Sequence, residues 1–164
     1  MNSYRKRQVT IVAAVVGLWL ASAQAASPDG FLGTWELDIS KTPLPADPSA
    51  AVPKSVTVTI KDAGGGKRTN QVVIVSADGK KVEQTPVTYG IEGSTSLTGN
   101  PQADSMTMTH PDASTEIVTN YKAGKQVQRS TAKLSVDGKQ DVITIDSVDK
   151  NGKPVQQILI FNRK

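Results

Sequence analysis

Apolar and polar residues alternate along most of this chain. In segment 55–61, SVTVTIK, the apolar residues occupy every second position and threonines lie between them. Since successive side chains of a strand point to opposite faces, this pattern predicts a half-buried β-strand. The remaining predicted strands share this character or are rich in Val, Ile and Thr. They are 33–39, 70–76, 81–88, 94–98, 105–110, 115–121, 126–136, 142–148 and 155–162.

Short turn sequences separate several of these strands. They are Asp78-Gly79, Ala123-Gly124, Asp137-Gly138 and Asn151-Gly152. Asp-Gly and Asn-Gly pairs favour tight hairpins, so consecutive strands are expected to be antiparallel neighbours. An antiparallel up-and-down meander of about eight to ten strands protects its edges by closing into a barrel. We therefore predict an all-β, lipocalin-like barrel. The alternative, a two-sheet sandwich, needs longer crossovers than the second half of the chain provides.

A proline-rich segment interrupts the pattern. Residues 42–54 contain four prolines, which exclude a central strand or a regular helix. Our interpretation is a stiff surface connector between the first two predicted strands. The alternative is a lid over the barrel mouth, because long loops often have a function.

The N-terminal region has the layout of a secretory signal. Arg5, Lys6 and Arg7 precede an apolar run over residues 9–23, and Ala23-Gln24-Ala25 matches a cleavage site. The run is shorter than the roughly 20 residues that span a membrane, and no later stretch is long enough. We therefore predict a signal peptide over 1–25, one barrel domain over 26–164, and a periplasmic or secreted protein without a stable transmembrane segment after cleavage.

Composition narrows the expected partners. The signal region holds three of the 19 basic residues and none of the 15 acidic ones, so the remaining 16 and 15 leave a net charge of +1. No basic patch is visible, and nucleic acid is not a predicted partner. Residues 26–164 contain only five aromatic residues, too few for stacked sugar binding or single-strand platforms. Cysteine is absent, so pairing and packing alone must hold the fold.

The stretch Gly33-Thr34-Trp35 marks the first predicted strand. Trp35 alternates with Leu37 and Ile39, so its indole is expected to face the core. Gly33 lets the chain pass close by. We interpret both residues as structural, with Trp35 plugging one end of the barrel. Ligand contact by Trp35 is the alternative.

These features carry a resemblance to a known family. The Gly33-x-Trp35 start, the proline-containing loop and the hairpin series resemble the lipocalin and fatty-acid-binding (calycin) barrels. More closely, the chain is similar to exported bacterial lipocalin-like proteins of unknown function, which end in an Asp-x-x-Gly-Lys hairpin, here residues 149–153. The central Thr-Asp-Tyr motif of true lipocalins is absent. The resemblance implies that a basic residue near the chain end packs over the motif Trp, and Arg163 is the candidate.

Candidate catalytic chemistry is sparse. His110 is the only histidine, and it lacks the Cys or second His that a typical metal site or nucleophilic pair would supply. No Gly-x-Ser-x-Gly motif is present, and no carboxylate spacing marks a working pair. We therefore predict no catalytic residue, no metal site, no cofactor and no enzymatic activity. The alternative, an enzyme, would need a pocket in which His110 or a carboxylate meets another polar group, and Asp146 is a candidate for an inward-facing carboxylate.

The interior of a small barrel accepts packed side chains or one small ligand. Predicted inward residues include Val56, Val58, Ile60, Met106, Met108, Ile117 and Tyr121. Methionine adapts to irregular apolar shapes. Our candidate ligand-binding residues are Met106, Met108, His110 and Tyr121, and we expect the site away from Trp35. The leading hypothesis is an exported binding protein for a small apolar or amphipathic ligand. The alternative is a structural or interaction protein of the cell envelope with a filled barrel, whose protein partner the sequence does not identify.

Overall fold

Antiparallel strands follow one another along the described part of the chain, which in this computed structural model comprises residues 29–43, 52–98, 100–149 and 152–164. The predicted signal peptide and most of the proline-rich segment lie outside these residues. The strands are β1 (Gly33–Leu37), β2 (Ser55–Gly64), β3 (Lys67–Val75), β4 (Lys81–Glu83), β5 (Val87–Gly90), β6 (Gly93–Ser96), β7 (Ser105–Asp112), β8 (Thr115–Lys122), β9 (Lys125–Leu134), β10 (Gln140–Val148) and β11 (Pro154–Arg163).

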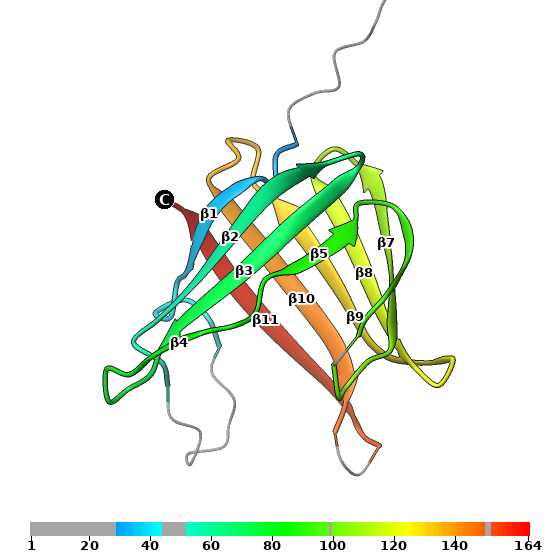
Figure 1. The fold of residues 1–164 in the computed structure, drawn as a ribbon. Coiled ribbons are helices and arrows are strands. Elements are labelled where there is room, and N and C mark those ends of the chain that lie inside the picture. Colours follow the sequence, from blue (N-terminus) through cyan, green and yellow to red (C-terminus); the bar gives the residue numbers. More distant parts are fainter. Residues whose placement is uncertain (1–28, 44–51, 99, 150–151) are drawn as a thin grey trace, which may run out of the picture.

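The strands form one curled sheet in the order β4-β3-β2-β1-β11-β10-β9-β8-β7-β6, and β5 also pairs with β3. The first strand pairs with the last, which joins the two ends of the meander. On the opposite side the pairing stops, and residues 91 and 92 connect β5 to β6. We call the boundary between β3–β5 and β6–β8 the seam. Figure 1 shows the resulting barrel, which confirms the predicted fold class, with eleven described strands rather than eight to ten.

The prediction of a single strand over residues 81–88 is wrong. The chain forms β4 against Val73–Val75 and β5 against Lys67–Asn70. Between them lie Gln84, Thr85 and Pro86. Proline has no N–H for a ladder and restricts the residue before it, so the strand breaks there. The break places Gln84 and Thr85 at the seam.

The predicted turns Asp78-Gly79, Ala123-Gly124 and Asp137-Gly138 fall between strands as expected, whereas Asn151 of the fourth predicted turn lies outside the described residues. Gly138, for example, has a φ of 66° in the β9–β10 turn, a conformation that glycine adopts readily. Its N–H donates to the Ser135 carbonyl at 2.8 Å, and Asp137 accepts hydrogen bonds from the Ser135 hydroxyl and the Lys139 N–H. Because such contacts are local in sequence, the hairpins follow directly from the turn residues.

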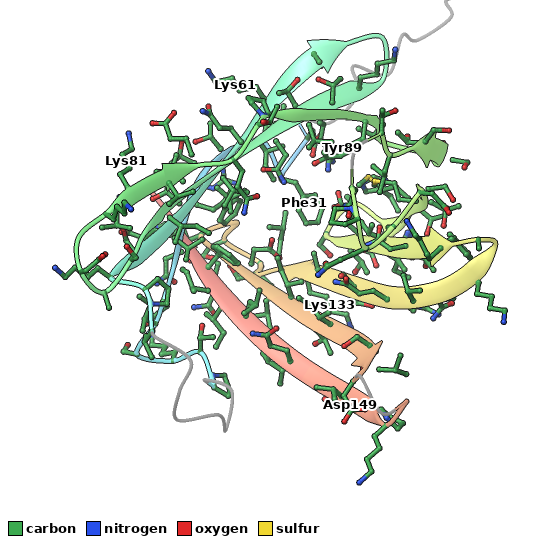
Figure 2. All side chains as sticks on the ribbon, turned by 60° about the horizontal axis from the view of Figure 1, so that its bottom comes forward. Phe31, Lys61, Lys81, Tyr89, Lys133 and Asp149 are labelled. Atoms are coloured by element: carbon green, nitrogen blue, oxygen red, sulfur yellow. The ribbon has the colours of Figure 1, made fainter. Side chains whose placement is uncertain are left out.

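Trp35 is buried at one end of the barrel, where only 2% of its surface is exposed. Its Nε1 donates a hydrogen bond to the Phe31 carbonyl at 2.9 Å, which fastens the segment before β1. Gly33 has a φ of 136°, and a Cβ at this position would lie 2.6 Å from Nη1 of Arg163. Glycine is therefore required both by the backbone angle and by the close approach of the arginine. Figure 2 shows Phe31 inside the barrel, whereas Lys61 and Lys81 extend outward.

The packed core is small. Tyr89, Met106 and Met108 form a buried cluster that Ile91, Leu97 and Val118 complete. Outside this cluster, Phe31, Trp35 and Phe161 are also buried. Inward residues such as Val58 and Ile60 are half-buried, and the interior retains space between them. Among the described residues, no helix is long and apolar enough to cross a membrane.

Candidate functional site

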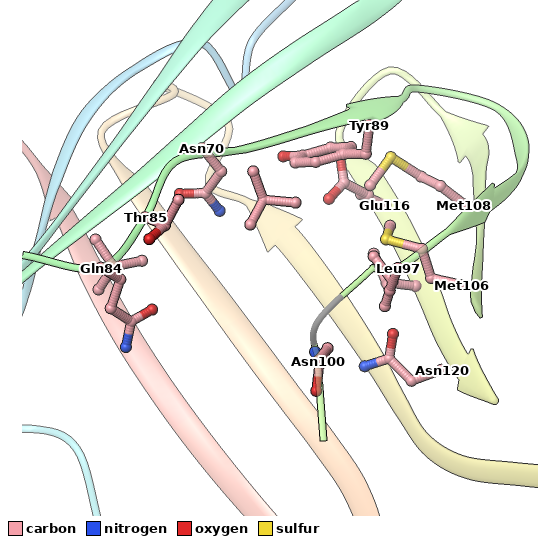
Figure 3. A pocket seen from close by; sticks show the side chains of 13 residues that line it. Asn70, Gln84, Thr85, Tyr89, Leu97, Asn100, Met106, Met108, Glu116 and Asn120 are labelled. Carbon is pink, nitrogen blue, oxygen red and sulfur yellow. The ribbon is translucent and has the colours of Figure 1, made fainter. Parts of the chain in front are cut away.

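A cavity of about 300 Å³ lies beneath the seam. Residues of β3 and β5 form one wall, and residues of β7 and β8 form the opposite wall (Figure 3). The unpaired boundary between these strand groups is therefore the place where the interior approaches the surface.

Apolar and polar side chains occupy different parts of this cavity. Leu97, Met106 and Met108 lie together on one side, whereas the amides of Asn100 and Asn120 lie at another end (Figure 3). Val72, Val87 and Val118 add to the apolar wall, and Gln84 and Thr85 add to the polar groups. Such an apolar wall with a few polar groups is typical of a site for a small amphipathic molecule.

A second cavity of about 180 Å³ lies deeper in the barrel. Its wall is mainly apolar and includes the two aromatic residues of the plugged end, Phe31 and Trp35. Asn70, Tyr89 and Glu116 line both cavities, so the two spaces adjoin. Further wall residues are Val58, Ile60, Ala132, Asp141, Ile143, Leu159 and Phe161.

A charged cluster lies beside these shared residues. Arg68, whose side chain is 3% exposed, donates to both carboxylate oxygens of Asp29 at 2.5 and 2.7 Å and also to Glu116. Nε2 of His110 lies 3.1 Å from Oε2 of Glu116 and 3.3 Å from Nη2 of Arg68. The guanidinium carbon lies 5.3 Å from the centre of the Phe31 ring.

The electrostatics of this cluster favour the charged arginine. Burial by itself lowers the pKa of Arg68, but hydrogen bonds and charges of Asp29 and Glu116 outweigh that effect and raise its pKa above the ordinary value. Burial, together with the charge of Glu116, also raises the pKa of Tyr89 to about 12. The Tyr89 hydroxyl is therefore neutral at physiological pH.

Asp141 introduces a second carboxylate into the interior. It is 6% exposed, lines the smaller cavity, and its Oδ1 has no hydrogen-bond partner among the described residues. Burial, and secondarily the charge of Glu116, raises the pKa of Asp141 to about 6, although a hydrogen bond with the Lys133 backbone acts in the opposite direction. Oδ1 of Asn70, in the wall shared by both cavities, is also without a partner in the described part of the chain.

The four candidate ligand-binding residues lie in different parts of the structure. Met106 and Met108 line the larger cavity. His110 belongs to the charged cluster behind Glu116 rather than to either cavity wall, and Tyr121 is in neither wall.

The prediction that the Ile117 side chain faces inward is wrong. Met106 is paired with Asn120, and Met108 with Val118. Directly paired residues share one face of a sheet, so the cavity face of β8 carries Glu116, Val118 and Asn120. The neighbouring Ile117 therefore belongs to the opposite face.

Sequence reasoning missed Asp141 as a cavity residue. Its alternation with Ile143 and Ile145 was the available signal, but Val142, Thr144 and Asp146 on the other face form an equally plausible pattern. In the structure Asp141 and Ile143 face the cavity, whereas Asp146 is exposed and accepts a hydrogen bond from Gln156. The Arg68 cluster joins residues 39 to 48 positions apart, and no local pattern marks it.

Within the described ranges, no group of three or more His, Cys, Asp or Glu side chains is placed to hold a metal ion. The arrangement is instead a partly apolar interior with a few buried acceptor atoms. Its chemistry suits reversible binding of a small molecule.

Comparisons with known proteins agree on the fold. No protein-family model matches the chain, and no curated protein matches it. Among solved structures, it is similar to wild-type fluorescent protein UnaG, with a TM-score of 0.54, 15% identity, and coverage of 82% of this chain and 97% of that one. It is also similar to Echinococcus granulosus fatty-acid-binding protein 1, with a TM-score of 0.50, 13% identity, and coverage of 82% and 97%. At these identities the likeness concerns the fold alone, and it agrees with the antiparallel up-and-down barrel described above.

Proposed function

We propose that this protein is an exported binding protein that holds one small amphipathic molecule inside its barrel. The observation that carries the proposal is the pair of adjoining cavities, of about 300 and about 180 Å³, beneath the seam and in the barrel centre. The larger one alone reaches the lower end of the range of roughly 300–1,000 Å³ that ligand pockets occupy. The alternative of a filled barrel does not account for this space.

The cavity walls support a ligand with both apolar and polar parts. Met106, Met108 and Leu97 offer an apolar surface, and methionine side chains adapt to ligands of irregular shape. Amide side chains of Asn100, Asn120 and Gln84 can bind polar groups. A similar barrel belongs to a protein named as fatty-acid-binding, which supports the class of function by analogy of fold.

The export part of the proposal rests on residues 1–25, with their basic start, apolar run and cleavage-type end. It places the protein in the periplasm or outside the cell. Expression of the full chain in a bacterial host, followed by cell fractionation and intact-mass measurement, tests this part. We expect the mature protein outside the cytoplasm with a mass that lacks residues 1–25. A full-length cytoplasmic product would contradict export.

A matched pair of variants tests ligand binding. Val72 lines the larger cavity, whereas its neighbour Val73 points to the other face of β3. The neutral dye Nile red should bind the protein saturably with one site per chain. Val72→Trp should fill the space and lower the dye's affinity roughly tenfold or more, equivalent to about 1.4 kcal/mol, while Val73→Trp should leave it unchanged. Equal behaviour of the two variants, or no saturable binding, would contradict an interior site.

A further inference from the structure

The charged residues that line the two cavities are both carboxylates. Glu116 lies in the wall common to both spaces, and Asp141 lies in the wall of the smaller one. No described Lys, Arg or His lines either cavity. A ligand that enters the barrel therefore meets negative charge and acceptor oxygens at its inner end.

Among the described residues, the cation in contact with the cavity residue Glu116 is Arg68, and it is already paired with carboxylates. Arg68 is almost fully buried behind Glu116, and its guanidinium is bound to Asp29 and Glu116. Transfer of this arginine to a ligand carboxylate would leave two protein carboxylates without their partner. Since an unpaired buried charge is strongly unfavourable, Arg68 does not serve as an anchor for an anionic ligand.

Two acceptor atoms at the inner end lack a partner among the described residues. Oδ1 of Asp141 belongs to a carboxylate that is only 6% exposed and lines the cavity, and Oδ1 of Asn70 lies in the shared wall. A buried acceptor without a hydrogen bond is unfavourable, so a ligand that donates to it recovers free energy that an apolar ligand does not. The acceptor atoms of Asp141 and Asn70 therefore favour a ligand whose head group donates hydrogen bonds.

We infer that the ligand class is an amphipathic amine, whose protonated nitrogen donates to Asp141 and Asn70 while its apolar body extends along Met106 and Met108. This inference rests on the proposed function and specifies its ligand. A protonated amine supplies several N–H donors and offsets the negative charge of the wall, whereas an alcohol supplies one neutral donor. A fatty-acid carboxylate would instead lie against Glu116 and Asp141 without a free cation.

Three compounds with one chain length separate these possibilities. Decylamine, decanol and decanoate, each below its micelle concentration, are titrated into the protein by calorimetry at pH 8. We expect decylamine to bind roughly tenfold or more tightly than decanoate, because hydrogen bonds to charged groups contribute on the order of 1.5–3 kcal/mol. Asp141→Asn should lower the affinity for decylamine about tenfold and leave decanol nearly unchanged.

Asp146→Asn is the matched control, because Asp146 is on the same strand but exposed on the outer face. It should leave decylamine binding unchanged, which separates a specific contact from general attraction of a cation. Circular dichroism of each variant verifies the fold.

The possible results separate the two proposals. If decanoate binds as tightly as decylamine, or if Asp141→Asn leaves the amine preference intact, the amine inference is overturned and the binding function stands. The same holds if decylamine fails to bind a protein that still binds Nile red. If neither the three compounds nor Nile red binds, the proposed function itself fails.

Discussion

The guanidinium carbon of Arg163 lies 4.2 Å from the centre of the Trp35 ring. The same side chain donates hydrogen bonds to the carbonyls of Gly30, Leu32 and Gly138. Arg163 therefore connects the segment before β1, the β9–β10 turn and the last strand at the plugged end. The basic residue expected over the motif tryptophan is confirmed in this position.

Removal of this arginine should loosen the plugged end. Arg163→Gln leaves three carbonyls without their charged donor, and we expect a loss of about 2–4 kcal/mol in the free energy of unfolding. Arg163→Lys should fall between the wild type and this variant, since it keeps the charge but not the fork of donors. Urea denaturation measures the effect, with Lys164→Gln as the exposed neighbouring control. Equal midpoints for Arg163→Gln and the control would contradict this role.

Truncation of Trp35 should remove the plug itself. Trp35→Ala is expected to lower the free energy of unfolding by about 3–5 kcal/mol, as for other large buried aromatic residues. Trp35→Phe should cost less, because it keeps most of the apolar volume and loses the hydrogen bond to the Phe31 carbonyl. Thermal and urea denaturation give both values. An unchanged stability of Trp35→Ala would mean that the indole does not support this end.

The charged cluster should behave as one unit. Arg68→Met leaves Asp29 and Glu116 without their cation, and we expect a loss of about 3–5 kcal/mol. The double variant Arg68→Met, Glu116→Leu should be more stable than Arg68→Met alone, because Glu116→Leu removes the buried carboxylate that Arg68→Met leaves unpaired. A double-mutant cycle in urea measures this coupling. Strict additivity of the two single changes would show that Arg68 and Glu116 do not interact energetically.

Asp141 should make the barrel less stable as pH rises. Its pKa is raised from 3.8 to about 6 in the folded state, so the folded protein holds this proton more tightly than the unfolded chain. Stability from this group is therefore present at low pH and is lost between about pH 4 and pH 6, by an amount on the order of 3 kcal/mol. Asp141→Asn should remove this loss and be more stable than the wild type at pH 8 by about 1–3 kcal/mol.

Other carboxylates have the opposite effect, so the comparison must be a difference between proteins. Hydrogen bonds lower the pKa of Asp78, Asp104 and Asp137, and their contribution is lost as pH falls. The difference in the free energy of unfolding between the wild type and Asp141→Asn, measured by urea denaturation at pH 4.5 and pH 8, isolates the contribution of Asp141. If Asp141→Asn is no more stable than the wild type at pH 8, burial of the ionised Asp141 carboxylate does not destabilise the fold.

The larger part of the fold could be predicted from local patterns. Alternation in β2 and the turns around Gly79, Gly124 and Gly138 predict hairpins, because the residues that make these contacts are close in sequence. The break between β4 and β5 was not predicted, although Pro86 marks its position in the sequence. Met106 and Met108 were predicted to face inward, and they do line the larger cavity.

The sequence by itself determined which segments are strands, how successive strands pair, and that a buried tryptophan marks one end. Only the tertiary structure decided which carboxylates enter the interior. A shift of one residue in register turns every side chain of a strand to the other face, and the register of β8 and β10 depends on their neighbours across the sheet. That long-range pairing turns Glu116 and Asp141 inward, places Arg68 beside Asp29, and leaves two cavities whose charged wall residues are carboxylates.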